Sequence, residues 1–315
     1  MAEWLYEEGI GENRAILVEG GEIVEAAIEL PGLRAGAVVP ARLSSAAGSA
    51  TLEDGTEAMV SPVGRLSEGA AFRAEVLRET IPERGRPKPP KVRPTELAFR
   101  AGPSLADRVG SPALPAHRLD LFEQAGWSEL LEQARTGEIA FPGGALRMSV
   151  TPAMTLFDVD GSLPAEELAE VGAEAAAKAI RRLGITGSIG IDLPTLPRER
   201  RQRAAAAVDG ILPQPFERTA VNGFGFLQIV RRRERPSIPE LVQGDPVAAT
   251  ARALLRRAGR ETGAVALNAT PRLVAFLEER PDWLKALARR TGGEIVLRAQ
   301  PGLAISAGHV QTVQS

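Results

Sequence analysis

The chain has 315 residues, enough to bury a sizeable core and to form about two domains, and its 44% hydrophobic and 25% charged residues are typical of a globular protein. The absence of cysteine excludes disulfides, thiolate zinc sites and thiol nucleophiles, and only two histidines, His117 and His309, could serve a metal site or a hydrolase triad. No apolar run approaches the roughly 18 residues of a membrane span, and the acidic start lacks the basic head of a signal peptide. We therefore expect a cytoplasmic protein that does not engage a membrane.

The first part of the chain predicts β structure. RAILVEGGEIVEAAIEL (14–30) consists of two apolar runs joined by two glycines, so we expect residues 1–35 to form a hairpin that packs on the core. Short, closely spaced strands with glycine turns continue over 36–93 and favour a small barrel of the OB type. The prolines and basic residues of PERGRPKPPKVRP (82–94) predict a linker or an extended arm.

A short region of loops and helices precedes the next sheet. Residues 94–137 predict a loop and a short helix, followed by an amphipathic helix over 119–137, where leucine and phenylalanine recur at helical spacing. EIAFPGGALRMSV (138–150) holds a Pro-Gly-Gly turn between two strand-like runs. AMTLFDV (153–159) is nearly all apolar, which indicates a buried central strand.

Strands and helices then alternate. PAEELAEVGAEAAAKAIRRL (164–183) begins with proline and acids and ends with arginines, which are the start and stop signals of a helix. SIGIDLPT (188–195) predicts the next strand, followed by a helix over 197–212 and a β segment over 216–231. Residues 138–243 are therefore expected to form an α/β core with a mixed sheet.

The tail repeats this pattern. Helices are predicted over 246–263 and 271–290, and strands over 263–270 and 293–300, so residues 244–315 are expected to be a C-terminal α/β subdomain. The predicted fold class is α/β (α+β): an N-terminal OB-fold β-barrel followed by an α/β core.

Two carboxylates stand at matching positions in this core. Asp158 ends one strand, a helix crosses over, and Asp192 ends the next strand, so the crossover rule places both at the same edge of a sheet. Neighbouring strands lie about 4.8 Å apart, which lets two carboxylates share one hard cation. Oxygen ligands without histidine or cysteine favour Mg²⁺, or Mn²⁺, over zinc, and Mg²⁺ commonly works on phosphate esters. The alternative is that these aspartates, and Asp160 above all, only cap a turn or a helix.

One stretch by itself resembles a phosphatase motif. LFDVDGSL (156–163) is similar to the first motif of haloacid-dehalogenase-type phosphatases, in which the first aspartate is the nucleophile and the second a general acid/base. That fold normally begins with this strand, whereas about 150 residues precede it here. QGDPVAAT (243–250) also lacks the second acid that the family's later motif requires.

The longer context resembles the catalytic core of the ribonuclease E/G family. The segments 137–161, 176–196 and 222–238 match that core in order and spacing, through FPGGALRMSV, LFDVDG, SIGIDLPT and NGFGFLQIVRRRER. NRAILVEGGEIVEAAIE (13–29) is similar to the family's opening hairpin. The resemblance covers most of the chain and implies that the barrel is an S1-type RNA-binding domain.

The resemblance also implies the site residues. Asp158 and Asp192 match the two Mg²⁺-binding aspartates, and Asp160 falls where the family has an assisting asparagine. Phe224 and Gly225 match its Phe-Gly pair.

Basic residues are the candidate contacts for RNA phosphates. The net charge of −2 does not indicate nucleic-acid binding, but a neutral protein can present basic stripes, and the alternative is that these are solvated helix faces. The candidates are Arg198, Arg200, Arg201, Arg231, Arg232 and Arg233, with Lys88 and Lys91 extending the track.

The chain departs from the family pattern at several points. Gly223 replaces an arginine and Gln228 a glutamate, and the cysteines of the family's zinc link are missing, which implies no zinc and no zinc-linked dimer. Residues 95–135 are too few for the full 5′-phosphate sensor region.

Together these features predict a Mg²⁺-dependent endoribonuclease that cleaves single-stranded RNA, with Asp158 and Asp192 holding the metal and Asp160 assisting. The alternatives are a non-catalytic RNA-binding protein on the same scaffold and a haloacid-dehalogenase-type phosphatase. The oligomeric state stays open.

Overall fold

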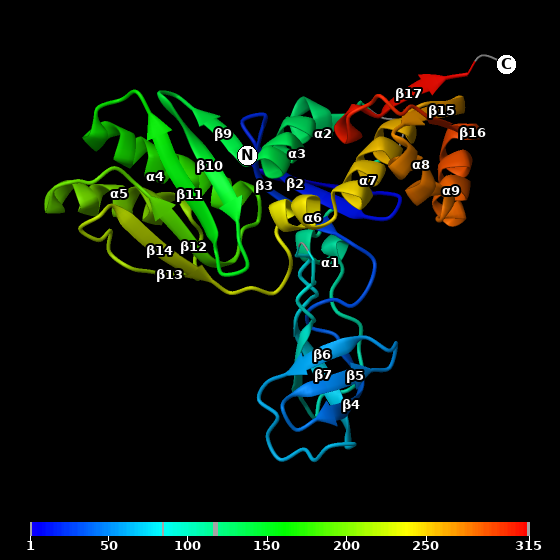
Figure 1. The fold of residues 1–315 in the computed structure, drawn as a ribbon, viewed down its shortest axis with the longest axis horizontal. Helices are drawn as coiled ribbons and strands as arrows, with labels where there is room; N and C mark the ends of the chain where they lie inside the picture. The colour runs from blue at the N-terminus through cyan, green and yellow to red at the C-terminus, as the bar shows by residue number, and fades with distance from the viewer. Residues whose placement is uncertain (1, 84, 116–118, 314–315) are drawn as a thin grey trace.

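A computed structural model describes residues 2–83, 85–115 and 119–313 (Figure 1). His117 lies outside these residues. The described chain is a mixed α/β structure with a closed five-stranded barrel and three further sheets. The small sheet that contains β2 and β3 lies at the centre of the view, and the barrel lies below it (Figure 1). The α/β part with β9–β14 lies on one side of this sheet and the part with β15–β17 on the other. No helix of the described chain is long and apolar enough to cross a membrane.

The central sheet has the antiparallel order β1-β2-β3. Its strands are β1 (Glu3–Glu8), β2 (Asn13–Glu19) and β3 (Glu22–Glu29). The predicted hairpin is confirmed: Gly20 and Gly21 both have positive φ angles, 63° and 89°, as a tight two-residue turn requires. Strand β1 was not predicted, because the acidic residues of MAEWLYEEG conceal an apolar side on which Tyr6 is only 3% exposed.

The barrel closes in the order β4-β5-β6-β8-β7, and small apolar side chains fill its interior. The predicted linker is wrong in its last four residues. These form β8, because Val92 is fully buried in the barrel and β8 pairs with both β6 and β7. The strands are β4 (Val38–Ser45), β5 (Ser49–Leu52), β6 (Glu57–Val60), β7 (Ala71–Arg78) and β8 (Lys91–Pro94).

Four short helices surround the central sheet. The single helix predicted over 119–137 is wrong, because Gly126 adopts a left-handed φ of 95° that ends one helix and begins the next. The helix preceding α7 was not predicted. The helices are α1 (Leu105–Val109), α2 (Leu121–Gln124), α3 (Trp127–Thr136) and α6 (Ile238–Gly244).

A six-stranded mixed sheet has the order β13-β14-β12-β11-β10-β9. Helix α4 packs on β9, β10 and β11, and α5 packs on α4, so both helices belong to one side of the sheet (Figure 1). The elements are β9 (Glu138–Phe141), β10 (Gly144–Val150), β11 (Thr155–Gly161), α4 (Ala165–Arg182), β12 (Gly187–Asp192), α5 (Arg198–Ile211), β13 (Glu217–Arg218) and β14 (Phe226–Arg231).

The C-terminal part has a three-stranded sheet of order β16-β15-β17. The single helix predicted over 271–290 is wrong, because Pro281 lacks an N–H donor and starts a second helix. The helix predicted to reach residue 263 ends at Ala258, and β17 was not predicted. The elements are α7 (Pro246–Ala258), β15 (Gly263–Ala269), α8 (Pro271–Glu278), α9 (Pro281–Thr291), β16 (Gly292–Ala299) and β17 (His309–Thr312).

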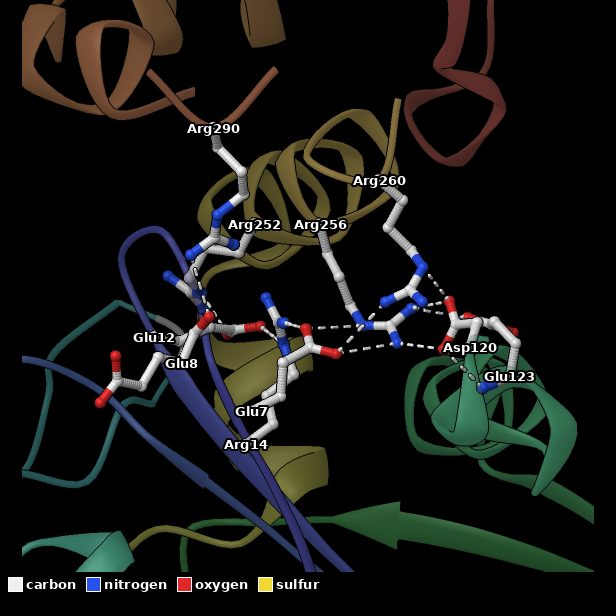
Figure 2. A network of polar contacts seen from close by, with 10 residues as sticks. All are labelled: Glu7, Glu8, Glu12, Arg14, Asp120, Glu123, Arg252, Arg256, Arg260 and Arg290. Atoms are coloured by element: carbon white, nitrogen blue, oxygen red, sulfur yellow. Dashed lines mark hydrogen bonds and ion pairs between the residues drawn. The ribbon is translucent and has the colours of Figure 1, made fainter. Parts of the chain in front are cut away.

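A buried charge network joins the central sheet to α2 and α7 (Figure 2). Arg14 is fully buried between Glu7 at 2.5 Å and Glu12 at 2.6 Å. Arg256 bridges Glu7 to Asp120 at the start of α2, with N···O distances of 3.1 and 2.6 Å. Glu123, Arg252 and Arg260 complete the network. Because most of these charges are shielded from water, each one depends on its partners.

This network predicts a specific pH dependence. Burial alone raises the pKa of the Asp120 carboxyl group, but hydrogen bonds from Arg256 and the Glu123 amide, with the charges of Arg256 and Arg260, hold it below its ordinary value. A lowered folded pKa stabilises the protein above the unfolded value of about 4, and this stability is lost as the pH falls through the folded pKa. We expect Asp120→Asn to lower the free energy of unfolding by about 1–3 kcal/mol at neutral pH, and this difference to narrow in acid.

Denaturant unfolding between about pH 7 and about pH 3 would measure this difference. Asp282→Asn is the control, because the Asp282 side chain is 90% exposed and its ion pair with Lys285 is on the surface. A constant difference between Asp120→Asn and the parent at every pH would contradict the assignment.

Candidate functional site

The two predicted aspartates lie side by side. Strands β11 and β12 are parallel neighbours, as the crossover rule predicts, and Asp158 pairs with Asp192 in their register. Residues paired in this way point to the same face of the sheet, on strands about 4.8 Å apart. Both side chains are exposed.

The alternation of side chains between the two faces of each strand explains this placement. Phe157, Val159 and Ile191 are buried in the core that contains α4, so the intervening aspartates face the opposite side of the sheet. The two carboxylates therefore lie on an accessible surface rather than within packed side chains.

Asp160 lies on the same face as Asp158 but already has a partner. Its Oδ2 is 3.1 Å from Nη1 of Arg147, which is on β10 directly opposite Asp158. Asp158 and Asp192 form no hydrogen bond or ion pair with any described residue through their side chains. No group of three or more metal-ligating side chains is found in the described chain, so a cation here would rest on two carboxylates.

A tight turn lies beside Asp192. The side-chain oxygen of Asn222 accepts hydrogen bonds from the amides of Phe224, at 2.9 Å, and Phe226, at 3.0 Å. The amide of Leu193 donates to the carbonyl of Gly225 at 3.2 Å, which holds the turn against the end of β12. The Phe224 ring is 84% exposed at the tip of this turn.

Only part of the predicted basic set lies near this turn. Arg198 and Arg201, in the first turn of α5, line a cavity of about 370 Å³ together with Arg218. Arg200 instead pairs with Glu166 of α4 at 2.9 Å and so links the two helices. Arg201 donates from Nη1 to the carbonyl of Val221 at 3.5 Å, so it lies next to the segment that leads into this turn.

The second arginine run lies at the other end of the sheet. Strand β14 is antiparallel to β12, so Arg231 pairs with Gly187 while Phe226 pairs with Asp192. Arg231 donates to the carbonyl of Ile185 at 2.9 Å, and burial lowers its pKa while the charge of Glu25 opposes this effect. Arg232 pairs with Glu234, and Arg233 with Glu240. The structure does not bring this run to the two aspartates.

The two predicted lysines belong to the region around the barrel. Lys88 pairs with Glu83 at 2.5 Å and donates to the carbonyl of Pro152 at 2.7 Å. It therefore joins the segment before β8, which was predicted to be an arm, to the loop between β10 and β11. Lys91 is half-buried in β8.

Sequence patterns missed three residues that the structure makes prominent. No local pattern singles out Asn222 or Arg147. The partners of Asn222 are set by the conformation of the turn, and the partner of Arg147 is set by strand pairing. Phe99 lies beyond the predicted barrel boundary, yet it is 55% exposed beside the barrel, with the Arg73 guanidinium 5.2 Å from its ring centre. The isolated β-bridge between Arg100 and Val38, which fixes that segment on the barrel, could not be read from local spacing.

Comparison with known proteins adds no assignment. No protein-family model matches the chain, and no curated protein is significantly similar to it. The candidate site therefore rests on its own geometry.

The turn beside Asp192 depends on Gly225. Its φ is 92°, and a Cβ atom there would lie 2.1 Å from the carbonyl oxygen of Leu193. We expect Gly225→Ala to reduce the free energy of unfolding by about 2 kcal/mol or more, because both the backbone conformation and the contact become unfavourable.

Denaturant unfolding of Gly225→Ala and Gly223→Ala would check this expectation. Gly223 is the matched control, because the nearest atom to its added Cβ is Arg201 Nη1 at 3.9 Å. Equal stability of the two variants would show that the close approach does not constrain the turn.

Proposed function

We propose that this protein is a Mg²⁺-dependent endoribonuclease that acts on single-stranded RNA and resembles the ribonuclease E/G family. The in-register pair of Asp158 and Asp192 carries the proposal. Two exposed carboxylates on adjacent strands, with no side-chain partner among the described residues, are a suitable donor set for a hard divalent cation that keeps several of its waters.

The residues at this site would have different roles in catalysis. Asp158 and Asp192 would hold Mg²⁺, or Mn²⁺, which when bound stabilises negative charge on a phosphodiester and makes hydroxide available. Arg147, held by Asp160, places a positive charge on the same face, where it can contact a phosphate. Asp160 would assist by orienting Arg147 and polar groups around the aspartate pair.

The barrel supports a role in RNA binding. Its strand order, with the first three strands followed by the fifth and fourth, and the parallel pairing of β6 with β8 favour an OB-type fold, here of the S1 type. Phe99 with Arg73 beside it offers an aromatic face and a positive charge on the outside of this barrel.

A second aromatic surface lies next to the aspartates. The exposed ring of Phe224 and the neighbouring Arg198 and Arg201 combine a stacking surface with positive charge. Single-stranded RNA is bound by this combination, because every base has a face that can stack and every linkage carries a phosphate.

A non-catalytic RNA-binding protein is the second candidate. The ion pair of Asp160 with Arg147 leaves only two free carboxylates at the site, and Gly223 and Gln228 replace charged residues of the resembled pattern. On this alternative, the same surfaces bind RNA without cleaving it.

Asn substitutions of the two aspartates test the nuclease proposal. Asp158→Asn or Asp192→Asn should reduce Mg²⁺-dependent cleavage of a labelled single-stranded RNA by at least about a hundred-fold while RNA binding is retained, because only the charge on the ligand atoms is lost. EDTA should abolish cleavage by the parent protein, and Asp282→Asn should cut at the parental rate.

Cleavage by Asp192→Asn at the parental rate would refute the metal assignment. Binding by the parent without any cleavage would support the non-catalytic alternative. Turnover of a small phosphate monoester that is lost in Asp158→Asn, with no cleavage of RNA, would instead favour the phosphatase.

The aromatic surfaces predict affinity effects. Phe224→Ala and Phe99→Ala should each weaken binding of a single-stranded oligonucleotide by about 1–3 kcal/mol, the usual contribution of one stacked base. Fluorescence anisotropy at fixed salt would measure the effect. Leu119→Ala is the control. Leu119 is an apolar residue that is 69% exposed and belongs to neither surface, so this substitution should leave the affinity for the oligonucleotide unchanged. Unchanged affinity in both phenylalanine variants would exclude stacking at these positions.

A further inference from the structure

A further cavity, lined by several arginines, lies at the end of the six-stranded sheet opposite the aspartates. It has a volume of about 340 Å³ and is bounded by the central sheet, α1, the end of α4 and the segment after β14. The register of β12 separates the two places, since Gly187 pairs with Arg231 beside the cavity and Asp192 lies five residues further on, about 16 Å away at about 3.3 Å per residue. This cavity is therefore distinct from the proposed metal site.

The wall of the cavity is strongly positive. Five arginines line it, Arg108, Arg181, Arg231, Arg232 and Arg235, against the two glutamates Glu25 and Glu234. Both glutamates are already used: Glu25 pairs with Arg181 at 3.5 Å, and Glu234 pairs with Arg232 at 3.0 Å and Arg235 at 3.1 Å.

Two of the arginines have no carboxylate partner. Within the described chain, Arg108 and Arg231 form no ion pair with an acidic residue at salt-bridge distance. The nearby acids that attract Arg108 have partners of their own, since Glu29 pairs with Arg34 at 3.6 Å and Glu79 with Arg235 at 3.4 Å. Burial lowers the pKa of Arg108, and the like charge of Arg235 lowers it further. The cavity thus holds two guanidinium groups that have no direct carboxylate partner among the described residues.

Hydrogen-bonding groups around the cavity are also incomplete. Within the described chain, two buried atoms of its lining residues have neither a hydrogen-bond nor an ion-pair partner, Nη1 of Arg108 and Oγ1 of Thr186. The Nε atoms of Arg181 and Arg235 also form no hydrogen bond, but they lie 3.5 Å from Glu25 and 3.4 Å from Glu79. Buried polar groups are almost always paired in folded proteins, so the unpaired groups of Arg108 and Thr186 in the lining of this cavity point to a ligand. A suitable ligand carries negative charge and several acceptor oxygens.

We propose that this arginine-lined cavity binds a phosphate group. A phosphate presents several acceptor oxygens and a charge near −2, and its oxygens match the planar fork of a guanidinium. The volume exceeds that of the phosphate alone, and the Trp4 indole also lines the cavity, which leaves room for a nucleoside part against an aromatic face. This inference does not depend on the proposed nuclease activity.

Titration calorimetry with inorganic phosphate, at constant ionic strength, tests the proposal in the full chain. We expect saturable binding by the parent protein. Arg108→Gln should weaken it about ten-fold or more, since one charge-assisted hydrogen bond is lost. Thr186→Val should weaken it to a smaller extent. Arg272→Gln is the matched control, because Arg272 is exposed on α8 outside the cavity, and it should bind as the parent does.

Absence of saturable binding by the parent, or equal binding by Arg108→Gln and Arg272→Gln, would overturn the proposal. Thermal unfolding of each variant shows whether it is folded. If Arg108→Gln does not fold, the affinity of Thr186→Val for phosphate is compared with that of the parent instead. Competition then distinguishes the source of the phosphate. Displacement of phosphate by uridine monophosphate identifies a free nucleotide as ligand, whereas displacement only by a single-stranded oligoribonucleotide identifies the RNA chain.

Discussion

The parallel register between β11 and β12 is the constraint on which the candidate site depends. Asp158 and Asp192 lie side by side on one face of the sheet because the core that contains α4 buries Phe157, Val159 and Ile191 on the other face. A slip of one residue in either strand would turn its aspartate into the core and an apolar side chain into water. The burial that stabilises the sheet therefore also sets the positions of the two carboxylates.

Arginine has two contrasting roles in this molecule. In the network of Figure 2, Arg14 and Arg256 are buried but surrounded by carboxylates, and they hold the central sheet against α2 and α7. In the arginine-lined cavity, Arg108 and Arg231 form no ion pair with any acidic residue of the described chain. The desolvation of a guanidinium is offset within the protein in the first case, whereas in the second an anionic ligand would complete the arrangement.

The candidate nucleic-acid surfaces come from separate parts of the chain. Phe224 lies beside the aspartates on a turn organised by Asn222, and Phe99 lies beside the barrel next to Arg73. Lys88 links the arm to Pro152 in the loop before β11, which ties the barrel region to the sheet that carries the aspartates.

The local features of the protein could be predicted from the sequence. Periodicity, glycine turns and helix start and stop signals identified the β2–β3 hairpin, most barrel strands and the β11-α4-β12 unit, and the crossover rule placed Asp158 beside Asp192, because these depend on residues close in the chain. Three features emerge only from long-range packing: Lys91–Pro94 closes the barrel, Arg231 lies at the opposite end of the sheet from the aspartates, and Arg147 pairs with Asp160. Burial of Val92, antiparallel pairing of β14 and cross-strand charge contacts join residues distant in sequence, and no local pattern encodes such pairings.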